Sequence, residues 1–136
     1  MKKIIWPGIV AGVVNLILNL AISFLFIRLP QIAADYNNTA LIRPWSDPLM
    51  SLFFLYPILF GIILAWVWHK TKAIFSGGKT SRALKFAGSI FLVVTIPGMF
   101  MSYTCFPLAF LTVISWTFSG LVASLVAGLI LVRMNE

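Results

Sequence analysis

Charged residues divide this chain into long apolar stretches, and the lengths of those stretches predict the fold. No acidic, basic or histidine residue occurs in 4–27 or in 48–68, and a third such stretch covers 86–132. A helix rises about 1.5 Å per residue and needs about 20 residues to cross a bilayer core of about 30 Å. The first two stretches therefore predict one membrane span each, and the third predicts two spans joined by a turn.

The prolines of the third stretch indicate where its turn lies. A break at Pro97 leaves too few residues before it to cross a bilayer, whereas a break near Pro107 leaves two spans of sensible length. The residues just before Pro107 ("SYTC", 102–105) are also polar. We expect a hairpin at about 102–107, with Pro107 in the first turn of the last helix. Pro97 is then a kink inside the third helix, where neighbouring helices satisfy the freed carbonyl.

Capping residues predict where the helices begin. Asp47 before Pro48 is typical of an N-cap followed by proline at the first helical position, and Thr80 or Ser81 can cap the third helix. The predicted fold class is an all-α membrane protein, a single domain (1–136) whose four transmembrane helices form an up-down antiparallel bundle. The predicted spans are about 4–28, 48–70, 82–103 and 107–133. We expect the first to be retained, because its apolar run is longer than the roughly 7–15 residues of a signal peptide.

Composition supports the membrane class. Only 10% of the residues are charged and the mean hydropathy is +1.04, whereas a soluble domain carries about 25% charged residues. With so few charges the chain could not cover its own surface in water. The lone Cys105 cannot form an intrachain disulfide and has no metal-ligand spacing around it, so we expect a small apolar filler at a helix end and no cofactor or metal.

The distribution of cations predicts the orientation. Lys2 and Lys3 precede the first span, and the loop between the second and third spans carries cations without any acid: Lys70, Lys72, Lys79, Arg82 and Lys85. The loop between the first two spans balances two arginines with two aspartates. The positive-inside rule then places both termini and the basic loop in the cytoplasm (N-in, C-in). We expect the inner (plasma) membrane of a prokaryotic cell. The expected interfacial aromatics are Trp6, Trp66 and Trp68 inside, and Tyr36, Trp45 and Tyr103 outside.

The basic loop has a further predicted role. We expect its five cations to contact anionic lipid headgroups as well as to set the topology. The "GGKTS" within it is similar to the end of a phosphate-binding P-loop, but the full pattern needs glycine where Ala73 lies and a strand before it, so that interpretation is rejected. No nucleic-acid partner is expected.

Two carboxamides lie in the middle of the first span, where water is scarce. Gly8, Gly12, Asn15, Asn19 and Ser23 follow one another at spacings of three or four residues and so share one helix face. Carboxamides facing lipid would lack hydrogen-bond partners, so this face is predicted to turn toward protein or water.

The other spans carry small and polar residues at matching depths. The predicted mid-membrane polar face comprises Asn15, Asn19, Ser23, Thr95, Ser115 and Ser119. The predicted packing positions are Gly8, Gly12, Gly61, Gly120, Ala123 and Gly128. Helix packing with hydroxyls and amides across the interfaces is the first interpretation. A pathway or pocket for water, an ion or a polar solute is the second, and a homo-oligomer contact through Gly8 and Gly12 is the third.

The middle of each predicted span lacks ionisable residues, which narrows the range of possible functions. No such group lies in the middle of a span, which disfavours proton-coupled carriers, and the lone His69 has no carboxylate nearby in sequence to make it a base, so no enzyme is expected. We predict a small polytopic scaffold or accessory membrane subunit that docks a partner membrane protein or copies of itself. The alternatives are an oligomeric passive channel or carrier for a small solute, and a lipid-interacting or lipid-moving protein.

Overall fold

The computed structural model describes residues 2–135, and those residues form helices and turns without any strand. The long helical segments are α1 (Lys2–Phe26), η1 (Pro48–Ser51) continuing into α3 (Leu52–Thr71), α4 (Lys79–Ile90) continuing through η2 (Phe91–Thr95) into α5 (Ile96–Cys105), and α6 (Phe110–Asn135). Each of these four segments is long and apolar enough to cross a membrane. The predicted all-helical chain with four membrane-length helices is therefore confirmed.

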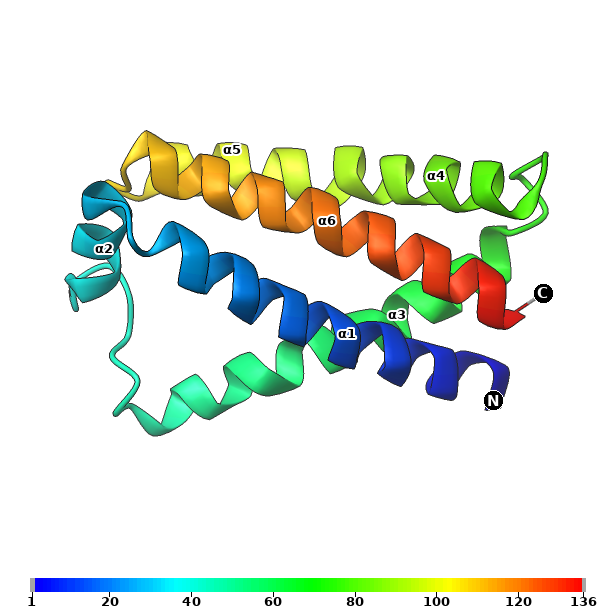
Figure 1. Ribbon diagram of the computed structural model, residues 1–136, viewed down its shortest axis with the longest axis horizontal. Coiled ribbons are helices and arrows are strands. Elements are labelled where there is room, and N and C mark those ends of the chain that lie inside the picture. The colour runs from blue at the N-terminus through cyan, green and yellow to red at the C-terminus, as the bar shows by residue number, and fades with distance from the viewer. Residues whose placement is uncertain (1, 136) are drawn as a thin grey trace.

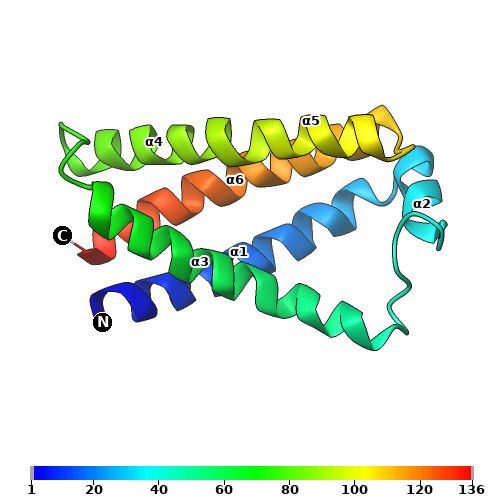
Figure 2. The same cartoon turned by 180° about the vertical axis from the view of Figure 1, so that it is seen from behind.

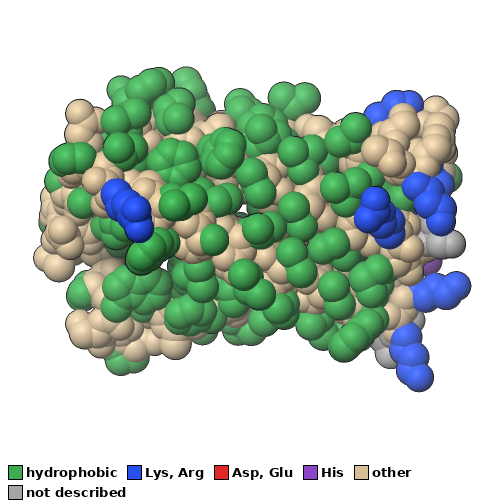
Figure 3. All heavy atoms as spheres, viewed as in Figure 1, with side chains coloured by type: hydrophobic (Ala, Val, Ile, Leu, Met, Phe, Trp, Pro, Cys, Tyr) green, Lys and Arg blue, Asp and Glu red, His purple; other side chains and the backbone are tan. Residues whose placement is uncertain are grey.

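The four long segments run in alternating directions (Figure 1). α1 begins and α6 ends at the same end of the molecule, close to the turn that joins α3 to α4. We call this the basic end, because Lys and Arg side chains gather there while hydrophobic side chains cover the middle of the visible face (Figure 3). The opposite end carries α2 (Pro30–Asn37) and the α5–α6 turn, and we call it the α2 end.

Tight packing is concentrated toward the basic end. The core cluster there comes from α1, α3, α4 and α6: Ala11, Leu64, Ala65, Trp68, Ala83, Phe86, Ala127, Leu131 and Val132. Trp68 is fully buried, and its ring packs against Phe75 and Phe86 with centroids 5.9 and 5.2 Å away. Neighbouring aromatic rings therefore enclose Trp68, and its predicted place at the membrane interface stays a prediction. Trp6 and Trp66 are exposed.

The segment between the first two spans contains a helix that the sequence analysis missed. α2 begins with Pro30 at its first turn and is too short and polar to show an apolar period. Ile32 is buried, with 1% of its surface exposed, so the segment is anchored to the bundle. Farther along, Asp47 accepts a hydrogen bond from the Leu49 N–H at 2.9 Å, which confirms the predicted N-cap before Pro48.

Asp47 also forms an ion pair with Arg43 at 2.8 Å. The Leu49 N–H and then the Arg43 guanidinium hold the pKa of the Asp47 carboxyl below its ordinary value. These contacts fix the start of η1 on the outside of the bundle.

The α5–α6 turn lies later in the chain than predicted. Helix α5 continues through "SYTC" to Cys105, and α6 begins only at Phe110, so the turn near Pro107 exists but covers 106–109 instead of about 102–107. The placement of Pro107 in the first turn of the last helix is wrong. The Ser102 hydroxyl donates to the Gly98 carbonyl at 2.9 Å, and Thr104 does the same to Phe100 at 3.1 Å. Because these hydroxyls bond within their own helix, polar residues at this position do not end it.

The third long helix also begins earlier than predicted. Its N-cap is Gly78, without a side-chain cap, so Thr80 and Ser81 lie inside the helix and the predicted hydroxyl cap is wrong. Gly77 precedes it with φ +112°, a left-handed conformation that glycine adopts without steric cost. This glycine turns the chain into α4.

A π-helical turn interrupts the third helix before Pro97. The Ile96 N–H bonds to the Phe91 carbonyl, five residues back, at the end of η2. Proline lacks a backbone N–H, so Pro97 cannot donate a hydrogen bond to the carbonyl of the preceding helical turn. The wider π-helical turn lies directly before this gap in the backbone hydrogen bonds. The predicted kink at Pro97 stays a prediction.

Candidate functional site: the α1 seam and the basic end

The face of α1 that carries Gly8 and Gly12 packs backbone to backbone against α3. A Cβ built on Gly8 would lie 2.5 Å from the Ile62 Cα, and one on Gly12 would lie 2.6 Å from the Ile58 Cα. A Cβ built on Gly61 would collide with the Gly8 carbonyl oxygen. Gly8 and Gly12 are buried by α3, so the interpretation of these two glycines as a contact between copies is wrong.

Asn15 lies farther along the same face, where α1 packs against α6. Its side chain is 4% exposed, and its Nδ2 donates to the Ala123 carbonyl at 3.2 Å. Its Oδ1 is buried and accepts no hydrogen bond from residues 2–135. Asn15 is the member of the predicted polar face whose side chain bonds across a helix interface.

Asn19 and Ser23 continue the face toward the α2 end and are half-buried. The Asn19 Nδ2 donates to the Asn15 carbonyl at 2.9 Å, which lies one turn back in the same helix. The second carboxamide therefore contributes to α1 itself rather than to a contact between helices.

The predicted hydroxyls bond locally or pack. The buried Ser115 donates to the Thr112 carbonyl at 2.7 Å within α6. Thr95 packs against α6 so closely that a Cβ on Gly120 would lie 2.5 Å from its Cγ2. Ser119 is half-buried. These contacts do not join the six predicted polar residues into one network across the helices. Ser115 and Asn19 bond within their own helices, and Asn15 bonds a backbone carbonyl of α6.

The remaining predicted packing positions lie along α6. A Cβ on Gly128 would lie 2.7 Å from the Ala83 carbonyl oxygen, so this glycine lets α4 approach α6 closely. Ala123 supplies the carbonyl that Asn15 binds and is half-buried. On its α1 and α4 sides, α6 is therefore a packing surface used inside the chain.

Asp35 on α2 forms a contact that the sequence analysis did not assign. Its Oδ2 accepts hydrogen bonds from the Ala109 N–H at 2.8 Å and from the Thr112 hydroxyl at 2.6 Å. One residue on, the Tyr36 hydroxyl accepts from the Trp116 Nε1 at 2.8 Å. An acid ahead of the N-terminus of α6 also suits the helix dipole. The sequence does show Asp35 as an acidic residue without an assigned role in a polar loop. Its partner Thr112, however, lies 77 residues away in the sequence.

The five predicted lipid-contacting cations divide into two groups. Arg82 donates to the Lys72 carbonyl at 3.0 Å and lies over the Trp68 ring at 5.3 Å, and Lys85 donates to the Ser76 carbonyl at 2.9 Å. These two side chains hold the α3–α4 turn. Lys70 and Lys79 are exposed, and Lys72 is half-buried.

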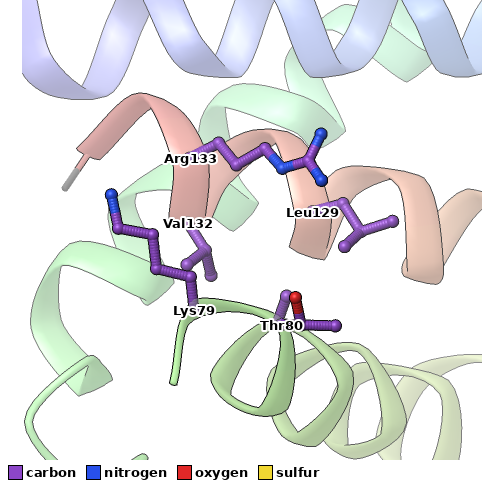
Figure 4. A pocket seen from close by; sticks show the side chains of 6 residues that line it. Lys79, Thr80, Leu129, Val132 and Arg133 are labelled. Atoms are coloured by element: carbon purple, nitrogen blue, oxygen red, sulfur yellow. The ribbon is translucent and has the colours of Figure 1, made fainter. Parts of the chain in front are cut away.

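Lys79 lines a small notch between α4 and α6, together with Thr80, Ala83, Leu129, Val132 and Arg133 (Figure 4). Its volume of about 10 Å³ is close to the roughly 10–15 Å³ that a single water needs. The notch is therefore too small to enclose an organic substrate. Arg133 was not among the predicted site residues.

Within residues 2–135, no three His, Cys, Asp or Glu side chains lie close enough to hold a metal ion. The side chains at the seam and at the basic end can pack, donate hydrogen bonds and attract anions. Comparisons of this chain with protein-family models, with curated proteins and with solved structures found no match.

Proposed function

We propose that this protein is an accessory or scaffold subunit of a membrane, which works by binding another membrane-embedded protein through the start of α3 (Leu52–Tyr56). Both termini and the basic end lie on the cytoplasmic side in this proposal, since the basic end holds most of the cations. A prokaryotic inner membrane fits this arrangement of the cations.

The observation that carries the proposal is the separation of the first five residues of α3, Leu52–Tyr56, from the bundle. Five consecutive residues, Leu52–Tyr56, are all exposed. Successive residues of a helix point about 100° apart, so five in a row cover every face. Their exposed fractions run from 39% to 62%, so no face of this segment is fully buried by the rest of the chain. Figures 1 and 2 show the same divergence, with α1 and α3 crossing and then separating toward the α2 end.

The diverging segment is rich in aromatic side chains. Trp45, Phe53 and Phe54 form a cluster with ring centroids 5.5 to 6.0 Å apart, and Tyr56 stacks on Phe60 at 5.8 Å. Large aromatic side chains are enriched at protein interfaces and lose little conformational entropy there. Helices associate in membranes through packing, and this segment offers a broad preformed surface for it.

Packing surfaces elsewhere on α1 and α6 are already used inside the chain. Gly8 and Gly12 are covered by α3, and Gly128 is covered by α4. A partner helix therefore has closer access to Leu52–Tyr56 at the start of α3 than to these small-residue positions.

The test is site-specific photo-crosslinking in native membranes. A benzoylphenylalanine at Leu55, 56% exposed, should give one discrete protein adduct. The same probe at Val93, 73% exposed in the middle of the third span, is the matched control and should react mainly with lipid. Lipid adducts alone at both positions would contradict the proposal.

A second arm identifies the partner class. The purified protein reconstituted alone in liposomes carries the same Leu55 probe. An adduct at twice the 15.1 kDa chain mass in liposomes means that the partner is a second copy. A protein adduct found in native membranes and absent from liposomes means a different membrane protein.

A further inference from the structure

We propose that the partner is a second copy of this chain, and that the two copies pack against each other along the outward face of α3. This inference rests on the proposed function, because it names the protein that covers Leu52–Tyr56. It extends the contact from that segment along α3 as far as Trp66. The two copies run parallel and are related by a two-fold axis along the membrane normal.

One face of α3 is already filled by the chain itself. Its buried positions follow one another at spacings of four, three and four residues: Pro57, Gly61, Leu64 and Trp68. A Cβ built on Gly61 would lie 2.8 Å from the Gly12 nitrogen, so this face meets the backbone of α1. Residues at such spacings share one side of a helix.

The opposite face of α3 repeats this spacing without a partner. Five residues, each 47–62% exposed, follow one another at spacings of four, three, four and three: Leu52, Tyr56, Leu59, Ile63 and Trp66. We call this set the α3 stripe. Residues two apart point about 200° apart, so Leu59 lies opposite the buried Pro57 and Gly61. In the view of Figure 2, α3 passes in front of α1 and no other helix covers it. An average repeat of 3.5 residues is the pattern along which two membrane helices pack side by side.

The Tyr56 hydroxyl distinguishes this stripe from a face that meets only lipid. Tyr56 lies about 12 Å along the helix from Pro48, where the candidate span begins. Within residues 2–135 its ring stacks on Phe60 at 5.8 Å, and its hydroxyl takes part in no hydrogen bond. Exposed hydroxyls on other helices bond a carbonyl of their own helix, as Ser89 does at 2.9 Å and Thr104 at 3.1 Å. The rigid phenol ring carries its hydroxyl away from the backbone, so Tyr56 needs a partner from outside the chain.

A second copy supplies that partner at the same depth. Copies of one chain share one orientation in the membrane, so a parallel two-fold pair places each stripe residue opposite its own equivalent. Tyr56 of one copy then faces Tyr56 of the other. A phenol hydroxyl both donates and accepts, so the pair forms an O–H···O bond without any further polar group. The stripe contains no charged residue, so it does not repel its own copy electrostatically.

The area of the stripe is sufficient for such a pair. Its residues are each about half exposed, and a large aromatic side chain has roughly 150–250 Å² of surface. With the flanking Phe53 and Leu55, one copy offers on the order of 500 Å² and a pair buries on the order of 1,000 Å². Specific protein interfaces begin at about this size.

The experiment is disulfide crosslinking of the purified full chain in liposomes, in a Cys105→Ser background. Leu59→Cys lies in the middle of the stripe. Oxidation with copper phenanthroline should give a dimer at twice the 15.1 kDa chain mass, because equivalent positions of a parallel pair lie close enough for a disulfide. Val93→Cys, 73% exposed in the middle of the third span, is the matched control. It should give about fivefold less dimer, since it meets a second copy only by collision.

Tyr56→Phe tests the hydroxyl pair, because it removes the oxygen and keeps the ring. Energy transfer between donor-labelled and acceptor-labelled copies, measured as lipid is added, reports the affinity of the dimer. We expect Tyr56→Phe to weaken the dimer about three- to tenfold, the effect of one hydrogen bond between membrane helices. Tyr103→Phe is the matched control. The Tyr103 hydroxyl on α5 likewise makes no hydrogen bond within residues 2–135, and its loss should leave the affinity unchanged.

Equal dimer yields from Leu59→Cys and Val93→Cys would overturn the proposal, since copies would then meet only by collision. Equal affinities of Tyr56→Phe and the wild type would overturn it as well. The Leu55 probe in native membranes judges the proposed function separately. A Leu55 adduct to a different protein, without stripe dimers, would leave that function standing and overturn the second copy as partner. Lipid adducts alone at Leu55 would contradict both.

Discussion

The Asp35 carboxylate on α2 accepts a hydrogen bond from the Thr112 hydroxyl on α6 at 2.6 Å. The same oxygen accepts from the Ala109 N–H just before α6 begins. Thr112 is fully buried. This contact fastens the segment between the first two spans to the start of the last helix, and it closes the α2 end of the bundle.

We expect Asp35→Ala to lower the free energy of unfolding by about 1–3 kcal/mol. The change removes an acceptor for an N–H at the helix start and leaves a buried hydroxyl without its partner. Unfolding in mixed detergent micelles measures the loss, and hydrogen exchange should show faster exchange in α2.

Two variants sharpen this first prediction. Thr112→Val removes the hydroxyl while Asp35 keeps the Ala109 N–H, so its loss should be the smaller one. Asn38→Ala, at an exposed position nearby, is the control and should change stability by about 0.5 kcal/mol or less. Equal stability of Asp35→Ala and the wild type would show that the contact contributes nothing.

The two carboxamides of α1 should differ in their contribution to stability. Asn15→Leu removes a buried bond to the Ala123 carbonyl and adds bulk to a packed interface, so we expect a loss of about 1–3 kcal/mol. Asn19→Leu removes a bond within its own helix at a half-buried position, and a loss of about 0.5 kcal/mol or less is expected.

Steric trapping in bicelles measures both carboxamide variants under one condition. The Asn15→Asp variant adds a check, because a charge at this buried position should cost more than leucine does. A larger loss at Asn19 than at Asn15 would mean that the polar face serves a purpose outside the described contacts.

Glycine-to-alanine substitutions should distinguish two effects on stability: the steric cost at the close crossing of α1 and α3, and the gain in helix propensity. Gly12→Ala places a Cβ 2.6 Å from the Ile58 Cα, a backbone atom that moves only if the helix moves. We expect a loss of about 1–3 kcal/mol from this overpacking.

Gly88→Ala is the matched control for the glycine prediction. It lies inside α4, and a Cβ there would meet no atom within 4 Å. The change should be neutral or stabilising by about 0.5–1 kcal/mol, because alanine loses less backbone entropy in a helix. Stabilisation by Gly12→Ala as well would contradict the close crossing.

The proposed orientation predicts a pattern of cysteine labelling in intact cells. A membrane-impermeant maleimide should label the native Cys105, which is exposed beside the α5–α6 turn at the α2 end. In a Cys105→Ser background it should label Asn38→Cys and leave Gly78→Cys unlabelled until the cells are opened. Labelling of Gly78→Cys alone in intact cells would reverse the orientation.

Much of this fold was readable from local sequence. Apolar stretches long enough to cross a bilayer predicted the four long helices, and Asp47 with Pro48 predicted the start of the second. These features depend on properties that each segment carries by itself: its length, its polarity and its capping side chain. The turn between the last two spans was predicted to start too early, at 102, because the hydroxyls of Ser102 and Thr104 bond within α5 and resemble loop residues only in the sequence.

The sequence by itself determined that the chain forms four membrane-length helices and that α1 carries small and polar residues on one face. Only the tertiary structure decided which helix each part of that face contacts. Gly8 and Gly12 meet α3, Asn15 meets α6, and Asn19 bonds within α1. That Lys79 of α4 and Arg133 of α6 line one notch was equally impossible to predict from the sequence. Helical periodicity fixes the direction of a side chain around its own axis, whereas the partner it meets depends on how whole helices cross, which many distant contacts set together.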